Sequence, residues 1–353
     1  MAFRNIIVVG ASAGGVPALS ELAENLPKDL PAAVFVVLHV TPFSQSHLPE
    51  VLSKCGPMRA DHAIDGEIVR PGQIYVAPPD RHLLVENDRV LVRNGPKENR
   101  FRPSIDALFR SAAYTYGARV IGCVLTGALD DGTSGLWTIK RRGGLAIIQE
   151  PDEAHFPDMP LNVLKEVEVD FRSRISEMGL LLARLVKRKA PGERKLSVNE
   201  SKRLKLEMEI ASYGDAFGRG IMDLGKLTPF TCPECQGALV SLKEGKMLRY
   251  RCHTGHAYTT SALLAGLTEA NEEQLWRAMQ SVEATTMLLN QFGKHLEDAK
   301  QPRIAKLFFK KARENRKWAR VIHESVLNQE RLSGDLGMGK LRTKERAPKP
   351  RKS

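Results

Sequence analysis

The sequence lacks any apolar stretch that approaches the roughly 20 residues of a membrane-spanning helix. Its first residues, Met1 to Asn5, also lack the long apolar segment behind a basic one that marks a secretory signal. The apolar run that follows them is too short to be the core of such a signal. These absences predict a soluble cytoplasmic protein with no membrane insertion.

Aromatic residues are scarce, at 6%, whereas basic residues are in excess, giving a formal net charge of +12. Such a charge permits contacts with nucleic acids or acidic surfaces. No aromatic-rich basic face accompanies the basic segments, so the composition does not favour nucleic-acid binding. A solvated tail, or attraction to an acidic protein, explains the charge more simply. With 353 residues the chain exceeds the usual size of one core, which predicts two or more domains.

Three polar residues stand where predicted strands of an α/β sheet end. They and the apolar runs before them are Ser12 after 6–9, His39 after 33–38 and Asp131 after 119–124. The turn around Ser12 is rich in glycine and leads into a helical pattern. Because the carboxyl ends of parallel strands share one crevice, we expect the three side chains to meet there. The pattern predicts a doubly wound, mostly parallel, Rossmann-like sheet.

These residue types fit a nucleophile, a general base and an orienting acid. A serine hydroxyl becomes a useful nucleophile when an imidazole accepts its proton, and a buried carboxylate fixes the tautomer of that imidazole. Unpaired N–H groups at the start of the following helix can stabilise an oxyanion. Ser12, His39 and Asp131 are therefore the candidate catalytic residues.

A glycine-rich turn between a strand and a helix also occurs in dinucleotide sites. The turn at 10–15 has no Gly-x-Gly-x-x-Gly spacing, and His39 stands where such a site would place an acid for the ribose. Taken singly, a histidine or aspartate at a strand end is more often an ordinary hydrogen-bonding group. The joint placement of the three residues favours the hydrolase.

Several segments in order resemble the catalytic domain of the chemotaxis protein-glutamate methylesterase (CheB) family, over roughly residues 1 to 190. They are Gly10–Gly15, Leu38–Val40, Asp65–Gly66, Pro71–Asp80, Arg102–Phe109, Leu125–Gly132 and Met159–Pro160. The resemblance implies that Ser12 is the nucleophile, His39 the base and Asp131 the orienting acid. It also implies that the substrate is a methylated cytoplasmic helix of a chemoreceptor, and that glutamine deamidation accompanies demethylation in some relatives. No catalytic cofactor is expected.

The chain departs from the family pattern at two positions and in its architecture. Ala13 and Ala128 replace side chains that family members often carry there, but the backbone N–H groups expected to form the oxyanion hole remain. Well-known members place a receiver domain ahead of the esterase, whereas here the catalytic strand begins within the first ten residues. We therefore expect any receiver or signalling partner to be a separate protein.

Five cysteines are present. Cys55 and Cys123 lie in apolar surroundings and are predicted to be plain buried thiols. The other three form a metal-like pattern, in which a C-x-x-C knuckle is followed by a hairpin-like segment and a second group. The predicted ligands of a structural zinc are Cys232, Cys235, Cys252 and His256, with His253 as the alternative fourth ligand. A redox C-x-x-C is the competing interpretation, but no thioredoxin-like strand and helix frame it.

The predicted organisation is a hydrolase domain followed by a zinc-ribbon-like module and an α-helical hairpin. The boundaries are 1–188 for the catalytic domain, 189–228 for a linker with a helical segment, 229–265 for the ribbon, 266–331 for the hairpin and 332–353 for a basic disordered tail. The apolar stripe of the hairpin is attributed to mutual packing of its helices, with a shared interface with another chain as the alternative.

The sequence thus predicts ester hydrolysis through an acyl-enzyme on Ser12. Two other function classes stay open. One is an acyl hydrolase or amidase that acts on another protein with the same triad. The other is a non-catalytic signalling scaffold, which the intact triad argues against.

Overall fold

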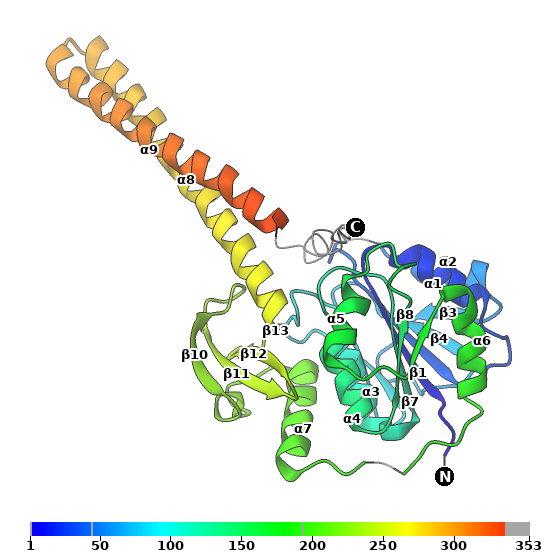
Figure 1. The fold of residues 1–353 in the computed structure, drawn as a ribbon. Coiled ribbons are helices and arrows are strands. Elements are labelled where there is room, and N and C mark those ends of the chain that lie inside the picture. Colours follow the sequence, from blue (N-terminus) through cyan, green and yellow to red (C-terminus); the bar gives the residue numbers. More distant parts are fainter. Residues whose placement is uncertain (1, 44, 193, 336–353) are drawn as a thin grey trace, which may run out of the picture. The chain divides into compact units, whose positions relative to one another are not determined.

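The computed structural model describes residues 2–43, 45–192 and 194–335, and side chains as far as residue 327. Two compact units divide the chain, residues 1–263 and 264–353 (Figure 1). In the described ranges no helix combines the length and the apolar character that crossing a membrane requires.

A seven-stranded sheet with the order β3-β4-β2-β1-β7-β8-β9 forms the centre of the first unit, and all its pairings are parallel. The strands are β1 (Ile6–Ala11), β2 (Ala33–Leu38), β3 (Arg59–His62), β4 (Gln73–Val76), β7 (Val120–Val124), β8 (Leu145–Gln149) and β9 (Phe171–Ser173). The chain proceeds outward from β1 to one edge and then returns to β7 on the other side of β1. The strand order therefore reverses between β1 and β7, and the predicted doubly wound fold is confirmed.

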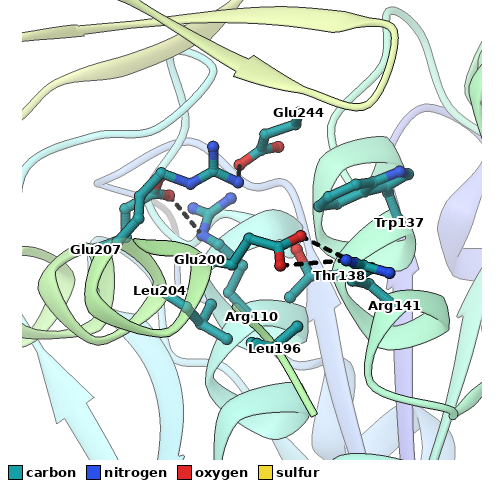
Figure 2. A pocket seen from close by; sticks show the side chains of 10 residues that line it. Arg110, Trp137, Thr138, Arg141, Leu196, Glu200, Leu204, Glu207 and Glu244 are labelled. Atoms are coloured by element: carbon teal, nitrogen blue, oxygen red, sulfur yellow. Dashed lines mark hydrogen bonds and ion pairs between the residues drawn. The ribbon is translucent and has the colours of Figure 1, made fainter. Parts of the chain in front are cut away.

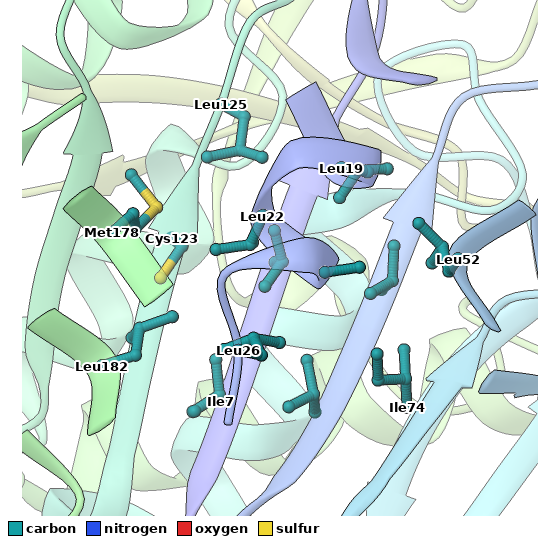
Figure 3. Packing of buried hydrophobic residues seen from close by; sticks show 14 of the residues in the cluster. Ile7, Leu19, Leu22, Leu26, Leu52, Ile74, Cys123, Leu125, Met178 and Leu182 are labelled. Atoms are coloured by element: carbon teal, nitrogen blue, oxygen red, sulfur yellow. The ribbon is translucent and has the colours of Figure 1, made fainter. Parts of the chain in front are cut away.

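Helices cover both faces of the sheet (Figure 1). They are α1 (Gly15–Glu24), α2 (Leu48–Cys55) and α6 (Ile175–Leu185) on one face, and α3 (Ile105–Tyr116), α4 (Thr133–Arg141) and α5 (Asp158–Glu166) on the other. On the first face, Ile7 of β1 packs with Leu22 of α1 and Leu182 of α6 (Figure 3). A sheet buried on both sides needs apolar residues at successive positions, which explains the unbroken runs in β1, β2 and β7.

The two cysteines outside the metal-like pattern differ in burial. Cys123 of β7 lies in the core, as predicted. Cys55 is exposed, so its prediction as a buried thiol was wrong. It is the last residue of α2, whose buried face is formed by Leu48, Pro49 and Leu52.

The first unit also contains a four-stranded antiparallel sheet, β10-β11-β12-β13, which is called here the ribbon sheet. Its strands are β10 (Lys226–Thr231), β11 (Ala238–Glu244), β12 (Met247–Cys252) and β13 (Ala257–Thr259). The predicted hairpin is confirmed as the antiparallel pair β11–β12. A two-stranded sheet, β5 (His82–Glu86) with β6 (Arg89–Arg93), and two short 3-10 helices, 117–119 and 221–223, also belong to the unit.

The segment expected to separate hydrolase and ribbon packs against both. Helix α7 (Val198–Tyr213) begins with a capping box between Ser197 and Glu200. Its buried side chains include Ile210 and Ala211, and Ala211 lies in one cluster with residues of β5, β6 and α3. The linker is also fastened near its start, where the Ala190 N–H donates to the Ala2 carbonyl at 2.8 Å. The expected separation of two independent modules is therefore not what the structure has.

Six charged residues form a buried cluster between hydrolase, α7 and ribbon sheet. This buried charge cluster consists of Glu98, Arg110 of α3, Glu207 of α7, Glu244 of β11, and Arg249 and Arg251 of β12, each at most 2% exposed. Figure 2 shows Arg110, Glu207 and Glu244 beside a cavity of about 20 Å³. A buried charge is tolerated only when it is paired, so these ion pairs fix how the ribbon sheet seats on α3.

The second unit is a helical hairpin of α8 (Thr260–Asp298), which starts in the first unit, and α9 (Pro302–Asp335). The two helices are separated by residues 299–301. The rings of Phe292 and Phe308 are in contact with their centroids 5.4 Å apart, and Asn315 donates to the Val282 carbonyl at 2.9 Å, so the helices run antiparallel. The predicted apolar stripe of the hairpin includes Met287, Leu288, Leu307 and Trp318, and all four are exposed. Mutual packing therefore accounts for only part of the stripe. The predicted disordered tail begins at 332, yet α9 continues to Asp335; the rest of the tail lies outside the described residues.

Candidate active site

The three predicted catalytic residues meet beside the point where the strand order reverses. Ser12 follows β1, His39 follows β2 and Asp131 lies in the loop between β7 and α4. Backbone hydrogen bonds hold these loops together, since the Ser12 N–H donates to the Thr126 carbonyl at 3.0 Å and the His39 N–H to the Ala11 carbonyl at 3.2 Å. The position agrees with the general rule that such sheets bind ligands at the carboxyl ends of their strands.

The side chains form one hydrogen-bonded row. His39 Nδ1 lies 3.0 Å from Ser12 Oγ, and His39 Nε2 lies 2.8 Å from Asp131 Oδ2. An ionised carboxylate only accepts, so Nε2 carries the proton and Nδ1 presents its lone pair to the serine hydroxyl. The imidazole is also stacked on the Phe101 ring, with centroids 3.8 Å apart and planes within 7°. The ring therefore has the tautomer and the orientation that a general base for Ser12 requires.

Asp131 is held by donors on both of its oxygens. Oδ2 also accepts from the Ile105 N–H at 2.8 Å, and Oδ1 accepts from Asn99 Nδ2 at 2.8 Å and from Ser104 Oγ at 3.0 Å. Burial by itself raises the pKa of Asp131, but the hydrogen bonds from His39, Asn99 and the Ile105 N–H lower that pKa to about 2. Asp131 is thus a fixed anion that orients His39.

A second carboxyl, Asp106, lies directly behind Asp131. Burial and the nearby charge of Asp131 raise the pKa of Asp106 well above its ordinary value. Its Oδ1 accepts from the N–H groups of Gly132 and Gly135, and its Oδ2 accepts from Asn99 Nδ2 at 2.9 Å. Asp106 therefore fixes the loop around Asp131 without competing with it for the imidazole.

His82 supports the same loop from β5. Burial lowers the pKa of His82 to about 4, so its ring is neutral near pH 7. The Ser104 N–H donates to His82 Nδ1 at 3.3 Å, which leaves the proton on Nε2 to be donated to the Pro96 carbonyl at 2.8 Å. His82 thereby holds Ser104, one of the donors to Asp131.

Two backbone N–H groups beside Ser12 are candidates for an oxyanion hole. In the described part of the chain, the N–H groups of Ala13 and Ala128 have no hydrogen-bond partner. The Gly127 backbone approaches the nucleophile so closely that a Cβ there would lie 2.8 Å from Ser12 Cβ and 2.0 Å from Met159 Sδ. Only glycine fits at 127, and this close approach brings the peptide before Ala128 next to Ser12.

A cavity of about 110 Å³ adjoins the turn that carries Ser12. Gly14 and Thr126 are among the residues that line it, and Glu21, Glu153 and His155 contribute polar groups.

The predicted metal ligands also come together, at one end of the ribbon sheet. The sulfur atoms of Cys232, Cys235 and Cys252 and a ring nitrogen of His256 all lie within 4.8 Å of one another. Three thiolates and one imidazole are a usual donor set for tetrahedral zinc, so the residues fit such an ion. His253, the alternative ligand, packs against Gly237 instead.

The first half of the chain is similar to known proteins. The family profile described as CheB methylesterase matches residues 7–182. A putative protein-glutamate methylesterase/protein-glutamine glutaminase of Leptospira interrogans is 36% identical over 180 residues, which are 51% of this chain and 93% of that protein. The chain belongs to the CheB methylesterase family.

Other relatives share the same region. Protein-glutamate methylesterase/protein-glutamine glutaminase 2 of Methanosarcina mazei is 35% identical over 192 residues, which are 52% of each chain. The crystal structure of the Thermotoga maritima CheB methylesterase catalytic domain superposes with a TM-score of 0.50 at 33% identity, over 52% of this chain and 98% of that one. The matched region of the family profile ends before α7, so α7, the ribbon sheet and the hairpin lie beyond it.

Sequence reasoning missed the residues that support the triad. Asn99, Phe101 and His82 were given no role, although Arg102–Phe109 belongs to the segments that carry the family resemblance. The sequence did contain one signal, which is the density of polar residues just before α3. A loop that buries an asparagine and a serine must provide hydrogen-bond partners for them.

Proposed function

We propose that this chain is a protein-glutamate methylesterase, a serine hydrolase that removes methyl esters from glutamyl side chains of chemoreceptors in chemotaxis signalling. The row from Ser12 Oγ through His39 to Asp131 carries the proposal, because it supplies nucleophile, base and orienting acid in a chain of this family. The Leptospira and Methanosarcina relatives, whose names include this activity, support the choice of substrate.

In the proposed reaction, Ser12 Oγ attacks the ester carbonyl while His39 Nδ1 takes the hydroxyl proton. The N–H groups of Ala13 and Ala128 face the oxyanion of the tetrahedral intermediate. Its collapse breaks the bond to methoxide, which leaves as methanol with the proton from Nδ1. Water, deprotonated by the same nitrogen, then releases the glutamate carboxylate and restores Ser12. Asp131 stays ionised throughout and stabilises the imidazolium.

Release of methanol from a methylated receptor fragment by the purified chain tests the proposal. Ser12→Ala should abolish release, whereas Ser20→Ala, on the neighbouring helix α1, should leave it unchanged. Hydrolysis of small esters without methanol release from the receptor would favour the competing acyl hydrolase. Unaltered release by Ser12→Ala, or no hydrolysis of any ester by the parent, would overturn the proposed mechanism.

The same site suits deamidation of glutamine, because attack on a side-chain amide leads to the same acyl-enzyme with ammonia as the leaving group. The relatives named as glutaminases support this second reaction. Ammonia release from an unmethylated receptor fragment should be lost in Ser12→Ala together with methanol release.

We also propose that Cys232, Cys235, Cys252 and His256 bind one structural zinc ion, with no catalytic cofactor elsewhere. The mutual distances of the four donor atoms support this over a redox pair, which would involve only two sulfurs. Elemental analysis should find one zinc per chain, and Cys235→Ser should lower that content. Protein that is folded throughout the ribbon sheet without metal would contradict the site.

A further inference from the structure

The ribbon sheet lies directly against the segment that supports the catalytic acid. Its edge strand β13 continues the pairing onto residues 97–99, since the Asn99 N–H donates to the Ala257 carbonyl at 2.7 Å and the Ala257 N–H to the Lys97 carbonyl at 3.2 Å. A parallel bridge between Glu98 and Ala257 accompanies these bonds. Residues 97–99 thereby become a further strand-like edge of the ribbon sheet.

The side chain of Asn99 connects this edge to the triad. Its Oδ1 accepts from the Thr259 N–H at 2.9 Å, and its Nδ2 donates to Asp131 Oδ1 and to Asp106 Oδ2. Asn99 is 3% exposed, so its amide has no water with which to exchange these partners. The Thr259 N–H decides which end of the amide is the acceptor, and thereby aims the NH2 group at Asp131.

Thr259 makes a second contact with the catalytic loop. Its Oγ1 donates to Asp130 Oδ1 at 2.7 Å, next to Asp131 in the chain. One residue of the ribbon sheet therefore holds the loop of the catalytic acid both directly and through Asn99.

The proposed metal ligands flank this strand. His256 immediately precedes β13, and the Cys252 N–H donates to the His256 carbonyl at 3.0 Å. Arg251, next to Cys252, pairs with Glu98 at 2.8 Å inside the buried charge cluster. A metal ion shared by Cys252 and His256 would fix the start of β13, three residues before Thr259.

We propose that Thr259 is a positioning residue for the esterase, and that metal binding at the ribbon controls turnover by holding β13 against Asn99 and thereby Asp131 in its catalytic orientation. The effect on turnover rests on the proposed function, whereas the structural coupling does not. Loss of the metal then loosens Asn99 and leaves Asp131 without one of its donors, so kcat falls while KM for a small ester changes little.

A double-mutant cycle on the full chain tests the coupling. The parent and Asn99→Ala are assayed with a small ester, each loaded with zinc and after treatment with a zinc chelator. A hydrogen bond to a charged acceptor that is lost corresponds to a change of about tenfold, so chelation should lower kcat of the parent by about that factor. In Asn99→Ala the link through the amide is already broken and only the bond from Thr259 to Asp130 remains, so chelation should lower kcat by a clearly smaller factor than in the parent. Equal factors in both proteins would overturn the proposal.

Variants of Thr259 provide a test that leaves the metal ligands intact. Thr259→Ala removes the bond to Asp130 and the bond that the hydroxyl accepts from the Ala262 N–H at 3.1 Å, and should lower kcat with little change in KM. Thr259→Ser keeps both bonds and should restore kcat. The matched control is Thr228→Ala in β10, which also removes two hydroxyl bonds within the ribbon sheet, one donated to the Leu239 carbonyl at 2.9 Å and one accepted from the Phe230 N–H at 3.3 Å. A loss in Thr228→Ala as large as in Thr259→Ala would show that the sheet's stability, not positioning, is responsible.

Hydrogen exchange separates the coupling from the proposed function. In Ser12→Ala, chelation should speed amide exchange at residues 97–106 and leave the β5–β6 hairpin, residues 82–93, unchanged. No change at 97–106, or equal change in both segments, would overturn the coupling. Faster exchange in the ribbon sheet and at 97–106, with residues 82–93 unchanged, in a protein whose parent hydrolyses no ester would uphold the coupling and overturn the proposed function.

Discussion

Among the carboxylates of the buried charge cluster, Glu207 should contribute most to the stability of the packing between α7, α3 and the ribbon sheet. Its Oε2 lies 2.8 Å from Arg249, 3.2 Å from Arg110 and 3.5 Å from Arg251, and the residue is 1% exposed. Burial opposes ionisation of Glu207, but the arginines Arg249, Arg110 and Arg251 hold its pKa well below the ordinary value. It is therefore an anion that balances three buried cations.

Glu207→Gln keeps the shape of the side chain and removes this charge. Three buried guanidinium groups then face only the carboxylates of Glu98 and Glu244 within the cluster. Breaking a buried ion pair from one side usually costs about 3–5 kcal/mol, because a charge is left uncompensated away from water. We expect the free energy of unfolding of the first unit to fall by about that amount.

Glu200→Gln on the same helix is the matched control. Glu200 pairs with Arg141 at 2.9 Å, but the side chains are 26% and 46% exposed, so the pair is worth about 0–1 kcal/mol. Glutamine also serves in the capping box, so the helix start is retained.

Urea unfolding followed by Trp137 fluorescence measures both variants, in a background in which Trp276 and Trp318 of the hairpin are replaced by phenylalanine. Trp137 is then the single tryptophan, and it reports on the interface because it adjoins Gly245 of the ribbon turn. Equal and small losses in Glu207→Gln and Glu200→Gln would refute the reasoning, since they would mean that the cluster is not held by desolvated charge.

Three further outcomes are expected. Asp131 has a lowered pKa, about 2 against 3.8, so its stabilisation of about 2 kcal/mol is present above about pH 4 and is lost as the pH falls toward 2. The difference in unfolding free energy between parent and Asp131→Asn should narrow over that range, and a constant difference would contradict the lowered pKa. Gly127→Ala should lower kcat by about tenfold or more, because its Cβ meets Met159 and Ser12; unchanged turnover would show that the loop yields. Asn315→Leu removes the amide hydrogen bonds between the two helices and should destabilise the hairpin by about 1–3 kcal/mol. Thermal melting of the full chain, followed by the helical circular dichroism signal, measures this loss, and an unchanged melting curve would argue against the contact.

The sheet and the triad were predictable because they follow from apolar runs and what stands at their ends. A parallel strand buried on both faces has a distinctive sequence, and Ser12, His39 and Asp131 each follow one. Asn99 could not be found in this way. It lies in a loop at a positive φ of 50°, and its importance comes from Thr259, a residue 160 positions later in the chain.

The packing of the ribbon sheet against α3 and α7 could not be predicted from the sequence, for a different reason. Charged residues such as Glu98, Glu207 and Arg249 usually lie on the solvent-exposed surface. They are buried only when a partner of opposite charge from another element is present. The alternation in β12 was the available signal, because Arg249 and Arg251 must lie on the same side of a strand. Two arginines on one side of a short strand indicate that carboxylates from other elements pair with them.

Buried charge and hydrogen bonds converge on the same loop. Glu98 pairs with Arg251 of the ribbon sheet, and the next residue, Asn99, donates to Asp131. The stability of the interface and the orientation of the catalytic acid therefore depend on adjacent residues of one segment. A change that loosens the charge cluster should lower kcat even without contacting the triad, since a shift of residue 98 displaces residue 99. This adjacency explains how a module outside the matched family region can act on a site inside it.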